Sequence, residues 1–344
     1  MDKMTHTKFN LNNFLMALSA SLDNTIKNNK YNIKYSSKRV AYIAVNIASK
    51  VKLSSEEISD IFSYSILYAN KIALENLDTF NFNNNIKDNK EIQNIVKLAF
   101  NIEQSLDIKD DIIINKKEII ELFSCKYTDE LFNTISFWYD LTSSYQLPFF
   151  IFNHIHDFTQ ELEFTKLINL SSTINKIIYD YVNIECIISI NKRCQSICEF
   201  YSFDSKDTAR MIISSNLINL GILHIPKDIL QKNSKLTFEE YEIMKSVPYH
   251  TNSIISQVFG FDDIALLASN VYEKLDGSGY PNNKKANNLS LKNRILSILT
   301  IYQALSEKRV YRKDYIHLEI VDILKLESQD KLDISIINDI SKIL

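Results

Sequence analysis

The stretch Glu273-Lys-Leu-Asp-Gly-Ser-Gly-Tyr-Pro281 contains two of the four glycines and one of the four prolines in the 344-residue chain. So few helix-breaking residues are typical of a nearly continuous series of helices, and this cluster therefore marks a loop whose backbone needs unusual freedom. Asp276-Gly277 favours a tight turn, Gly279 permits either a second positive-φ position or a close backbone approach, and Pro281 stiffens the end of the loop. The spacing alone is compatible with a structural turn and with a ligand or partner loop.

Helical periodicity precedes the loop along much of the chain. One predicted helix presents a single apolar face made of Val40, Ile43, Ala44, Ile47 and Val51. Ser54-Ser-Glu-Glu57 then predicts a capping box at the start of the next helix, and Thr237 to Glu240 predicts another.

A repeat within the sequence predicts two helical units. Asp204-Ser-Lys-Asp207 resembles the cap at Ser54, and the pairs Glu57 with Asp207 and Leu53 with Phe203 share one offset of 150 residues. Two landmarks at the same offset indicate a duplicated helical unit. A chain of this length is also long enough for two domains that each bury a core.

Composition excludes several classes of partner. With 39 basic and 42 acidic residues, the net charge of -3 gives no electrostatic basis for binding nucleic acid or an anionic membrane. No apolar run approaches the roughly 20 residues of a membrane span, and the N-terminus lacks an apolar signal core, so we expect a cytoplasmic protein. Cys186, Cys194 and Cys198 have helical spacing, and we interpret them as free thiols in a core.

The loop resembles the signature of the HD-GYP family of bacterial phosphohydrolases, in which His-His-Glu precedes Asp-Gly-x-Gly-Tyr-Pro. Six of its eight specified positions match, namely Glu273, Asp276, Gly277, Gly279, Tyr280 and Pro281. The similarity extends from about Asn175 to the C-terminus, and the first half resembles, more weakly, the extra bundle of tandem members. The resemblance implies an all-α protein of two tandem HD-type helical bundles: a degenerate HD-like bundle over residues 1–150 and a degenerate HD-GYP domain over residues 165–344.

The resemblance also implies a metal site whose ligands this chain lacks. Family members hold two or three iron or manganese ions that activate water for phosphodiester cleavage. At the matched ligand positions this sequence has Cys186 (or Ile190), Ile218, Asn219, Val247, Val271, Tyr272 and Thr300, and the first half has Ser36 and Tyr68-Ala69. Valine and isoleucine cannot coordinate a cation, so we expect no metal, no other cofactor and no catalytic residue. His224 and His250 lie at least two positions from a ligand place, and we do not expect them to restore the site.

A retained loop beside lost ligands predicts a catalytically inactive, regulatory or binding module in cyclic-dinucleotide signalling. The expected binding residues are Asp276, Gly277, Gly279, Tyr280 and Pro281 of the loop and the cations Lys245, Arg309 and Arg312, which suit phosphate oxygens. Candidate partners are a cyclic dinucleotide, a diguanylate cyclase (GGDEF) domain or other signalling protein, and a second copy of the chain.

Two alternatives stay open at this point. One is a metal-dependent phosphohydrolase, a cyclic di-GMP phosphodiesterase, whose site is rebuilt from Cys186, His224, His250 or Asp276. The other is a scaffold in which the bundles serve only to dimerise. Whether the chain is an enzyme is therefore left to experiment.

Overall fold

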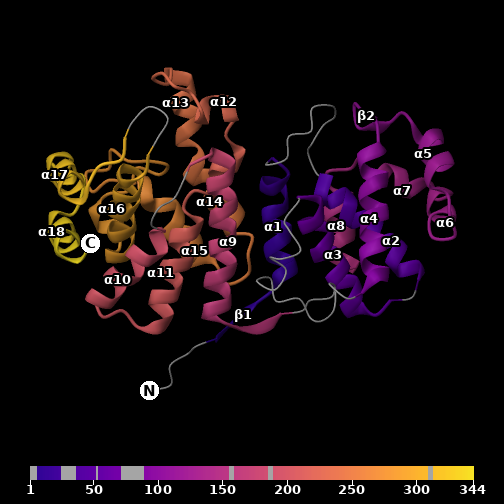
Figure 1. Ribbon diagram of the computed structural model, residues 1–344, viewed down its shortest axis with the longest axis horizontal. Helices are drawn as coiled ribbons and strands as arrows, with labels where there is room; N and C mark the ends of the chain where they lie inside the picture. The colour runs from indigo at the N-terminus through magenta and orange to yellow at the C-terminus, as the bar shows by residue number, and fades with distance from the viewer. Residues whose placement is uncertain are drawn as a thin grey trace. The chain divides into compact units, whose positions relative to one another are not determined.

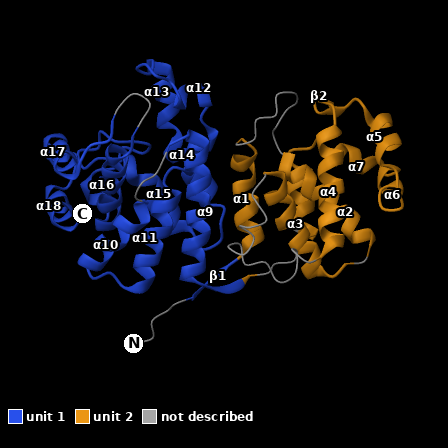
Figure 2. Ribbon diagram, in the orientation of Figure 1, with its two compact units in different colours: residues 1–9, 160–344 blue, residues 10–159 orange. Residues whose placement is uncertain are grey.

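The computed structural model describes residues 6–24, 36–51, 53–70, 89–154, 159–184, 189–308 and 313–344. The fold is all-α, as predicted, and the strands among the described residues are few and short (Figure 1). The chain divides into two compact units (Figure 2): residues 10–159, here called the N-terminal unit, and residues 1–9 with 160–344, here called the C-terminal unit.

The described residues of the N-terminal unit form helices and one small hairpin. The hairpin pairs β2 (Ile108–Lys109) with β3 (Ile112–Ile113). Its helices are α1 (Leu11–Asp23), α2 (Ser36–Lys50), α3 (Ser55–Ala69), α4 (Lys90–Ser105), α5 (Lys116–Phe123), α6 (Asp129–Phe132), α7 (Ile135–Asp140) and α8 (Gln146–His154).

The C-terminal unit is made of two segments of the chain, each of which contributes one strand, and the second segment continues as helices. The strands are β1 (His6–Phe9) and β4 (Gln160–Glu163). The α-helices are α9 (Phe164–Val182), α10 (Ile190–Phe200), α11 (Ser205–Leu217), α12 (Lys227–Leu230), α13 (Phe238–Lys245), α14 (Val247–Ile255), α15 (Asp262–Ser269), α16 (Leu291–Ser306), α17 (His317–Glu327) and α18 (Ile334–Ile343). Within the part of this unit that the structure describes, short 3-10 helices join them: η2 (Leu220–His224), η3 (Asn270–Tyr272) and η4 (Ala286–Asn288).

The predicted helix starts are confirmed. Ser54 Oγ accepts from the Glu57 backbone N–H at 3.2 Å, and the Glu57 carboxylate accepts from the Ser54 backbone N–H at 2.9 Å. Asp204 caps α11 through the Asp207 backbone N–H at 2.7 Å. These caps satisfy N–H groups that the first turn of a helix leaves without partners. Helices α3 and α11 thus begin at the offset that the sequence repeat predicted; common descent of the two halves stays a prediction.

Each unit buries a core around one helix. The predicted apolar face of α2 is buried, with Val40, Ile43 and Ile47 fully inaccessible to solvent. In the C-terminal unit, α16 contacts α10, α11, α15, α17, α18 and η3, so it forms the centre of that bundle. Cys194 and Cys198 are buried in α10, as predicted. No helix in the described part of the chain is long and apolar enough to cross a membrane.

A short antiparallel ladder holds the N-terminal residues on the C-terminal unit. β1 pairs with β4 in a register that runs from His6 opposite Glu163 to Phe9 opposite Gln160. The Phe9 ring lies 5.8 Å from the Phe261 ring, measured between centroids, which anchors β1 to the same unit. Sequence periodicity did not reveal this pairing, because its two strands are far apart in the chain.

A buried carboxyl group joins α1 to α2 in the N-terminal unit. Asp23 is 2% exposed, and its Oδ1 accepts from the Ser37 backbone N–H at 3.1 Å. Its Oδ2 has no hydrogen-bond partner among the described residues. Burial raises the pKa of Asp23 to about 6, with a smaller contribution from the negative charge of Glu103.

Replacing Asp23 by asparagine is expected to stabilise the protein above pH 6. The folded-state pKa of about 6 exceeds 3.8, the ordinary pKa of an aspartate in an unfolded chain. The contribution of Asp23 to stability is therefore greatest below about pH 4 and is lost as the pH rises through 6. We expect Asp23→Asn to gain about 2 kcal/mol at pH 7 and to lose this gain by pH 4. Urea unfolding of both proteins across this range measures the difference, and a difference that does not change with pH would contradict the assignment.

Candidate functional site

The loop after η3 is organised by one buried carboxylate. Glu273 is 2% exposed, and its two oxygens accept from the backbone N–H groups of Asn282 at 2.7 Å and Lys284 at 2.8 Å. The ammonium group of Lys284 in turn donates to the Asn270 side chain at 3.0 Å. Glu273 therefore ties the end of the loop to its beginning, which gives this motif position a structural role.

The two positions of the loop that carry glycine require it for different physical reasons. Gly277 has a φ of +85°, a conformation that a side chain disfavours. At Gly279 a Cβ would lie 2.4 to 2.5 Å from backbone atoms of Tyr272, Glu273 and Lys274, so the chain crosses itself there at a distance that only glycine allows. Both positions shape the loop rather than present a functional group.

The polar and aromatic groups of the loop are also fixed. Asp276 accepts from the Ser278 backbone N–H at 2.9 Å and from its hydroxyl at 2.7 Å, and these bonds lower the pKa of Asp276. The Tyr280 ring stacks on the Tyr272 ring with centroids 5.2 Å apart. Burial, followed by the nearby Tyr272 and Tyr241 hydroxyls, raises the pKa of Tyr280 and keeps its phenol protonated. The loop is thus a preformed surface that borders α13, the helix that carries Tyr241.

The described positions that match the family's metal ligands form a packed interior. Ile218, Val247 and Val271 are each 1% exposed and carry no donor atom. The Tyr272 hydroxyl donates to the Asn219 side-chain oxygen at 3.3 Å. The hydroxyl of Thr300 donates to the carbonyl of Leu296 at 2.7 Å within α16. Cys186 lies outside the described residues.

A close approach between η2 and α14 positions this interior. The Gly221 backbone N–H donates to the Thr251 hydroxyl at 3.0 Å, and that hydroxyl donates to the Ile218 carbonyl at 3.1 Å. A Cβ at Gly221 would lie 2.1 Å from the Val247 carbonyl oxygen. The glycine is required here because the backbone of α14 lies directly against it.

The same approach brings two histidines together. The His224 and His250 rings are stacked with centroids 4.7 Å apart and an interplanar angle of 8°. Burial lowers the pKa of both, and His250 lowers that of His224 further, so both imidazoles favour the neutral form. Both histidines were candidates for a rebuilt site in the sequence, but their spacing did not predict that the two rings stack.

Of the three cationic residues predicted to bind phosphate, the structure describes only Lys245. Lys245 donates to the Glu242 carboxylate at 2.6 Å, and its ammonium lies 5.0 Å from the centre of the Tyr241 ring. It therefore lies on the same helix as the tyrosine that borders the loop. Arg309 and Arg312 lie outside the described residues, and their roles stay predictions.

The sequence of the chain matches a known protein family. A family model described as "HD domain" matches residues 165–336, half of the chain. The chain belongs to the HD domain family. The predicted resemblance to the HD-GYP group is confirmed by relatives named for cyclic-dinucleotide phosphodiesterase activity.

These relatives share a limited part of their length with this HD domain protein. It is 29% identical over 134 residues to 3'3'-cGAMP-specific phosphodiesterase 1 of Vibrio cholerae, which covers 39% of this chain and 31% of that protein. It is 31% identical over 118 residues to the cyclic di-GMP phosphodiesterase PdeB of Borreliella burgdorferi, covering 34% of this chain and 31% of the relative. The matched segment thus spans less than a third of either relative.

One solved structure shares the fold of the HD domain protein over nearly its whole length. It is described as a cyclic GMP-AMP specific phosphodiesterase of V. cholerae (V-cGAP3), with a TM-score of 0.55, 14% identity and coverage of 98% of this chain and 99% of that one. At this identity the likeness shows the fold alone.

Family membership corrects one prediction from the sequence. We expected no cofactor, whereas the relatives are HD-type phosphodiesterases, a class that uses metal ions. The side chains at the matched positions that the structure describes do not fit such ions, because apolar groups, one amide and hydroxyls replace imidazoles and carboxylates. Among the described residues, no three His, Cys, Asp or Glu side chains gather closely enough to hold an ion. Any metal of this HD domain protein would thus need ligands other than the matched set.

Proposed function

We propose that this HD domain protein is a regulatory module that binds a cyclic dinucleotide and does not hydrolyse it. One observation carries the proposal: a loop held rigidly by Glu273 lies beside an interior in which Ile218, Val247 and Val271 are packed without donor atoms. A binding surface is therefore kept where the groups that activate water are replaced. The relatives support the class of ligand, because their names specify cyclic di-GMP and 3'3'-cGAMP.

The side chains divide into those that shape the surface and those that face a ligand. Asp276, Gly277 and Gly279 are occupied in holding the loop. Tyr280 offers an aromatic ring, and Lys245 offers positive charge for a phosphate diester. Pro281 fixes the chain after Tyr280. We include a cytoplasmic location and the cations Arg309 and Arg312 in the proposal.

Binding and hydrolysis assays on the whole chain test this function. We expect cyclic di-GMP or 3'3'-cGAMP to bind in calorimetry, and to give no product above the protein-free reaction when manganese or iron is supplied. Lys245→Ala is expected to weaken binding about tenfold. Lys235→Ala, which removes an exposed lysine just before α13, is the matched control and should leave binding unchanged. Turnover by the purified protein would reject the proposal, as would the absence of binding.

A second candidate function is phosphodiester hydrolysis at a rebuilt site. It is favoured by the His224 and His250 pair, whose neutral imidazoles are the form that ligates metals. The relatives named as phosphodiesterases support it equally. Metal-dependent turnover that disappears in the His224→Ala, His250→Ala double variant would establish this candidate in place of the first.

Protein partners form the remaining part of the proposal. A diguanylate cyclase (GGDEF) domain is the candidate partner for the loop, and self-association through the bundles is the candidate scaffold role. Sedimentation of the chain alone and with a purified GGDEF domain separates the two. A monomer that binds no such domain would leave only the dinucleotide function.

A further inference from the structure

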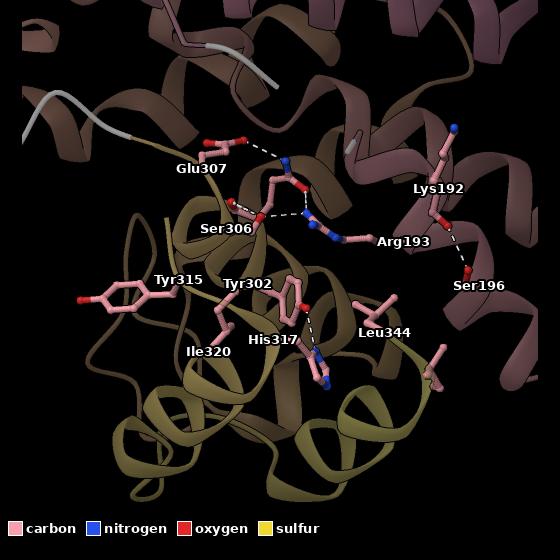
Figure 3. Close-up of a pocket in the computed structure, with 12 residues that line it drawn as sticks. Lys192, Arg193, Ser196, Tyr302, Ser306, Glu307, Tyr315, His317, Ile320 and Leu344 are labelled. Atoms are coloured by element: carbon pink, nitrogen blue, oxygen red, sulfur yellow. Dashed lines mark hydrogen bonds between the residues drawn. The ribbon is translucent and has the colours of Figure 1, made fainter. Parts of the chain in front are cut away.

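Two cavities in the described part of the C-terminal unit differ in size and in the groups that line them. The larger, of about 470 Å³, is bordered by residues of α10, α16, α17 and α18 (Figure 3). Its Arg193 guanidinium already donates to Gln303 and Ser306. The buried Glu307 carboxylate shares this lining, so the charges there do not select one class of ligand. The smaller cavity borders a polar atom that the described protein groups leave unsatisfied.

The smaller cavity lies beside Glu273. A volume of about 10 Å³ there is open to the centre of a water molecule, which is enough for one ordered water. The charged residues of its lining are two carboxylates, Glu273 and Asp333, and two cations, Arg294 and Lys331. Arg294 Nη1 also donates to Asp333 Oδ2 at 3.0 Å. Because these formal charges cancel, the lining suits a neutral polar occupant better than an ion.

Ser297 carries the unsatisfied atom. It lies on α16, is 5% exposed and lines this cavity. Its hydroxyl oxygen has no hydrogen-bond partner among the residues that the structure describes. A hydroxyl group that is buried without a partner costs free energy, and a single hydrogen bond recovers much of that cost. A water molecule in the adjoining cavity supplies this bond without any movement of the helix.

Glu273 has acceptor capacity left for the same water. Its buried carboxylate accepts from the backbone N–H groups of Asn282 and Lys284, whereas an ionised carboxylate offers about four lone-pair positions. Each further donor stabilises a buried negative charge. An internal water uses about three polar partners, and the buried amides of Asn270 and Asn293 in the lining supply the remainder.

We propose that this cavity is a site for one structural water, which accepts from the Ser297 hydroxyl and donates to the Glu273 carboxylate. The water joins the loop to α16, the helix at the centre of the C-terminal bundle. The loop is thus held both by its own hydrogen bonds and by the core of the unit. This site does not depend on whether the protein binds or hydrolyses a cyclic dinucleotide, so its tests are separate from those of the proposed function.

A high-resolution crystal structure of the whole chain tests the site directly. We expect an ordered water within about 3 Å of both Ser297 Oγ and a carboxylate oxygen of Glu273. A cavity without an ordered atom would overturn the proposal. A metal ion in that place, or a Ser297 hydroxyl turned towards a protein acceptor, would overturn it as well.

Hydrogen exchange tests the link from α16 to the loop. In Ser297→Ala the water loses one partner, and we expect the amides of Asn282 and Lys284, which donate to Glu273, to exchange about tenfold faster. Amides of the other helices in the unit should keep their rates. Equal acceleration throughout the unit would show a general loss of stability and would reject the link, as would unchanged rates at these two amides.

Ser214→Ala is the matched control for this variant. Ser214 is fully buried in α11, and its hydroxyl donates to the Arg210 carbonyl of the same helix at 2.7 Å. Its removal should leave exchange at Asn282 and Lys284 unchanged. If both alanine variants accelerate these amides to the same extent, the effect belongs to any lost buried hydroxyl and the proposed link is wrong. The crystallographic result on the unaltered chain decides the proposal even if Ser297→Ala does not fold.

Discussion

Gly221→Ala is expected to destabilise the protein by about 3 kcal/mol or more, because the new methyl group meets backbone that cannot turn aside. The added Cβ would lie 2.1 Å from the Val247 carbonyl oxygen and 2.9 Å from the Thr251 backbone nitrogen. Relief requires η2 to separate from α14, which also breaks the hydrogen bond from the Gly221 N–H to Thr251. The midpoint of urea unfolding measures the loss.

Gly260→Ala is the matched control for this prediction. Gly260 has a φ of +79°, and nothing lies within 4 Å of the Cβ it would gain. Its alanine variant meets only the backbone penalty of the left-handed region, about 1 kcal/mol. Equal losses in the two variants would show that steric contact between η2 and α14 does not limit the choice of residue 221.

Arg39→Met is expected to cost about 3–5 kcal/mol, since it leaves the Glu103 carboxylate buried without its cation. Arg39 Nε and Nη2 donate to Glu103 Oε1 at 3.0 and 2.8 Å, and the two side chains are 8% and 4% exposed. The pair joins α2 to α4 in the core of the N-terminal unit. Thermal and urea unfolding report the change.

A double variant and a surface pair complete this test. Arg39→Met with Glu103→Leu removes both charges and is expected to recover most of the lost stability. Lys50→Met breaks an exposed salt bridge in which Lys50 Nζ lies 2.6 Å from Glu130 Oε1. It should change the free energy of unfolding by less than about 1 kcal/mol. If Arg39→Met lowers the free energy of unfolding no more than Lys50→Met does, a group other than Arg39 stabilises the buried charge of Glu103.

Local sequence rules anticipated the helices well. The caps at Ser54, Asp204 and Thr237 begin helices because each supplies an acceptor to the first turn, a property of four neighbouring residues. Burial of the α2 face follows from its period in the same way. The loop from Glu273 to Pro281 was also recognisable in the sequence, because its backbone geometry requires glycine at positions 277 and 279.

Features that depend on distant contacts were not predictable from these rules. The stacking of His224 on His250 depends on the packing of η2 against α14. The cavity beside Arg193 requires α10, α16 and α18 to be assembled first. The high pKa of Asp23 arises from burial between helices, which its polar neighbours in the sequence do not indicate. The prediction that the protein has no cofactor was wrong for a different reason. It was made only from the residues at the matched metal-ligand positions, whereas the relatives belong to a class of phosphodiesterases that uses metal ions.

The ladder between β1 and β4 has a topological consequence. Phe9 and Gln160 are opposite each other in its last cross-strand pair, so the points where the chain departs for residues 10–159 and returns are separated by only about 5 Å. A two-residue hairpin turn spans such a gap. The intervening helical unit is therefore an insert between the two strands of a hairpin, and we expect that a two-residue turn in its place would keep the register of β1 and β4.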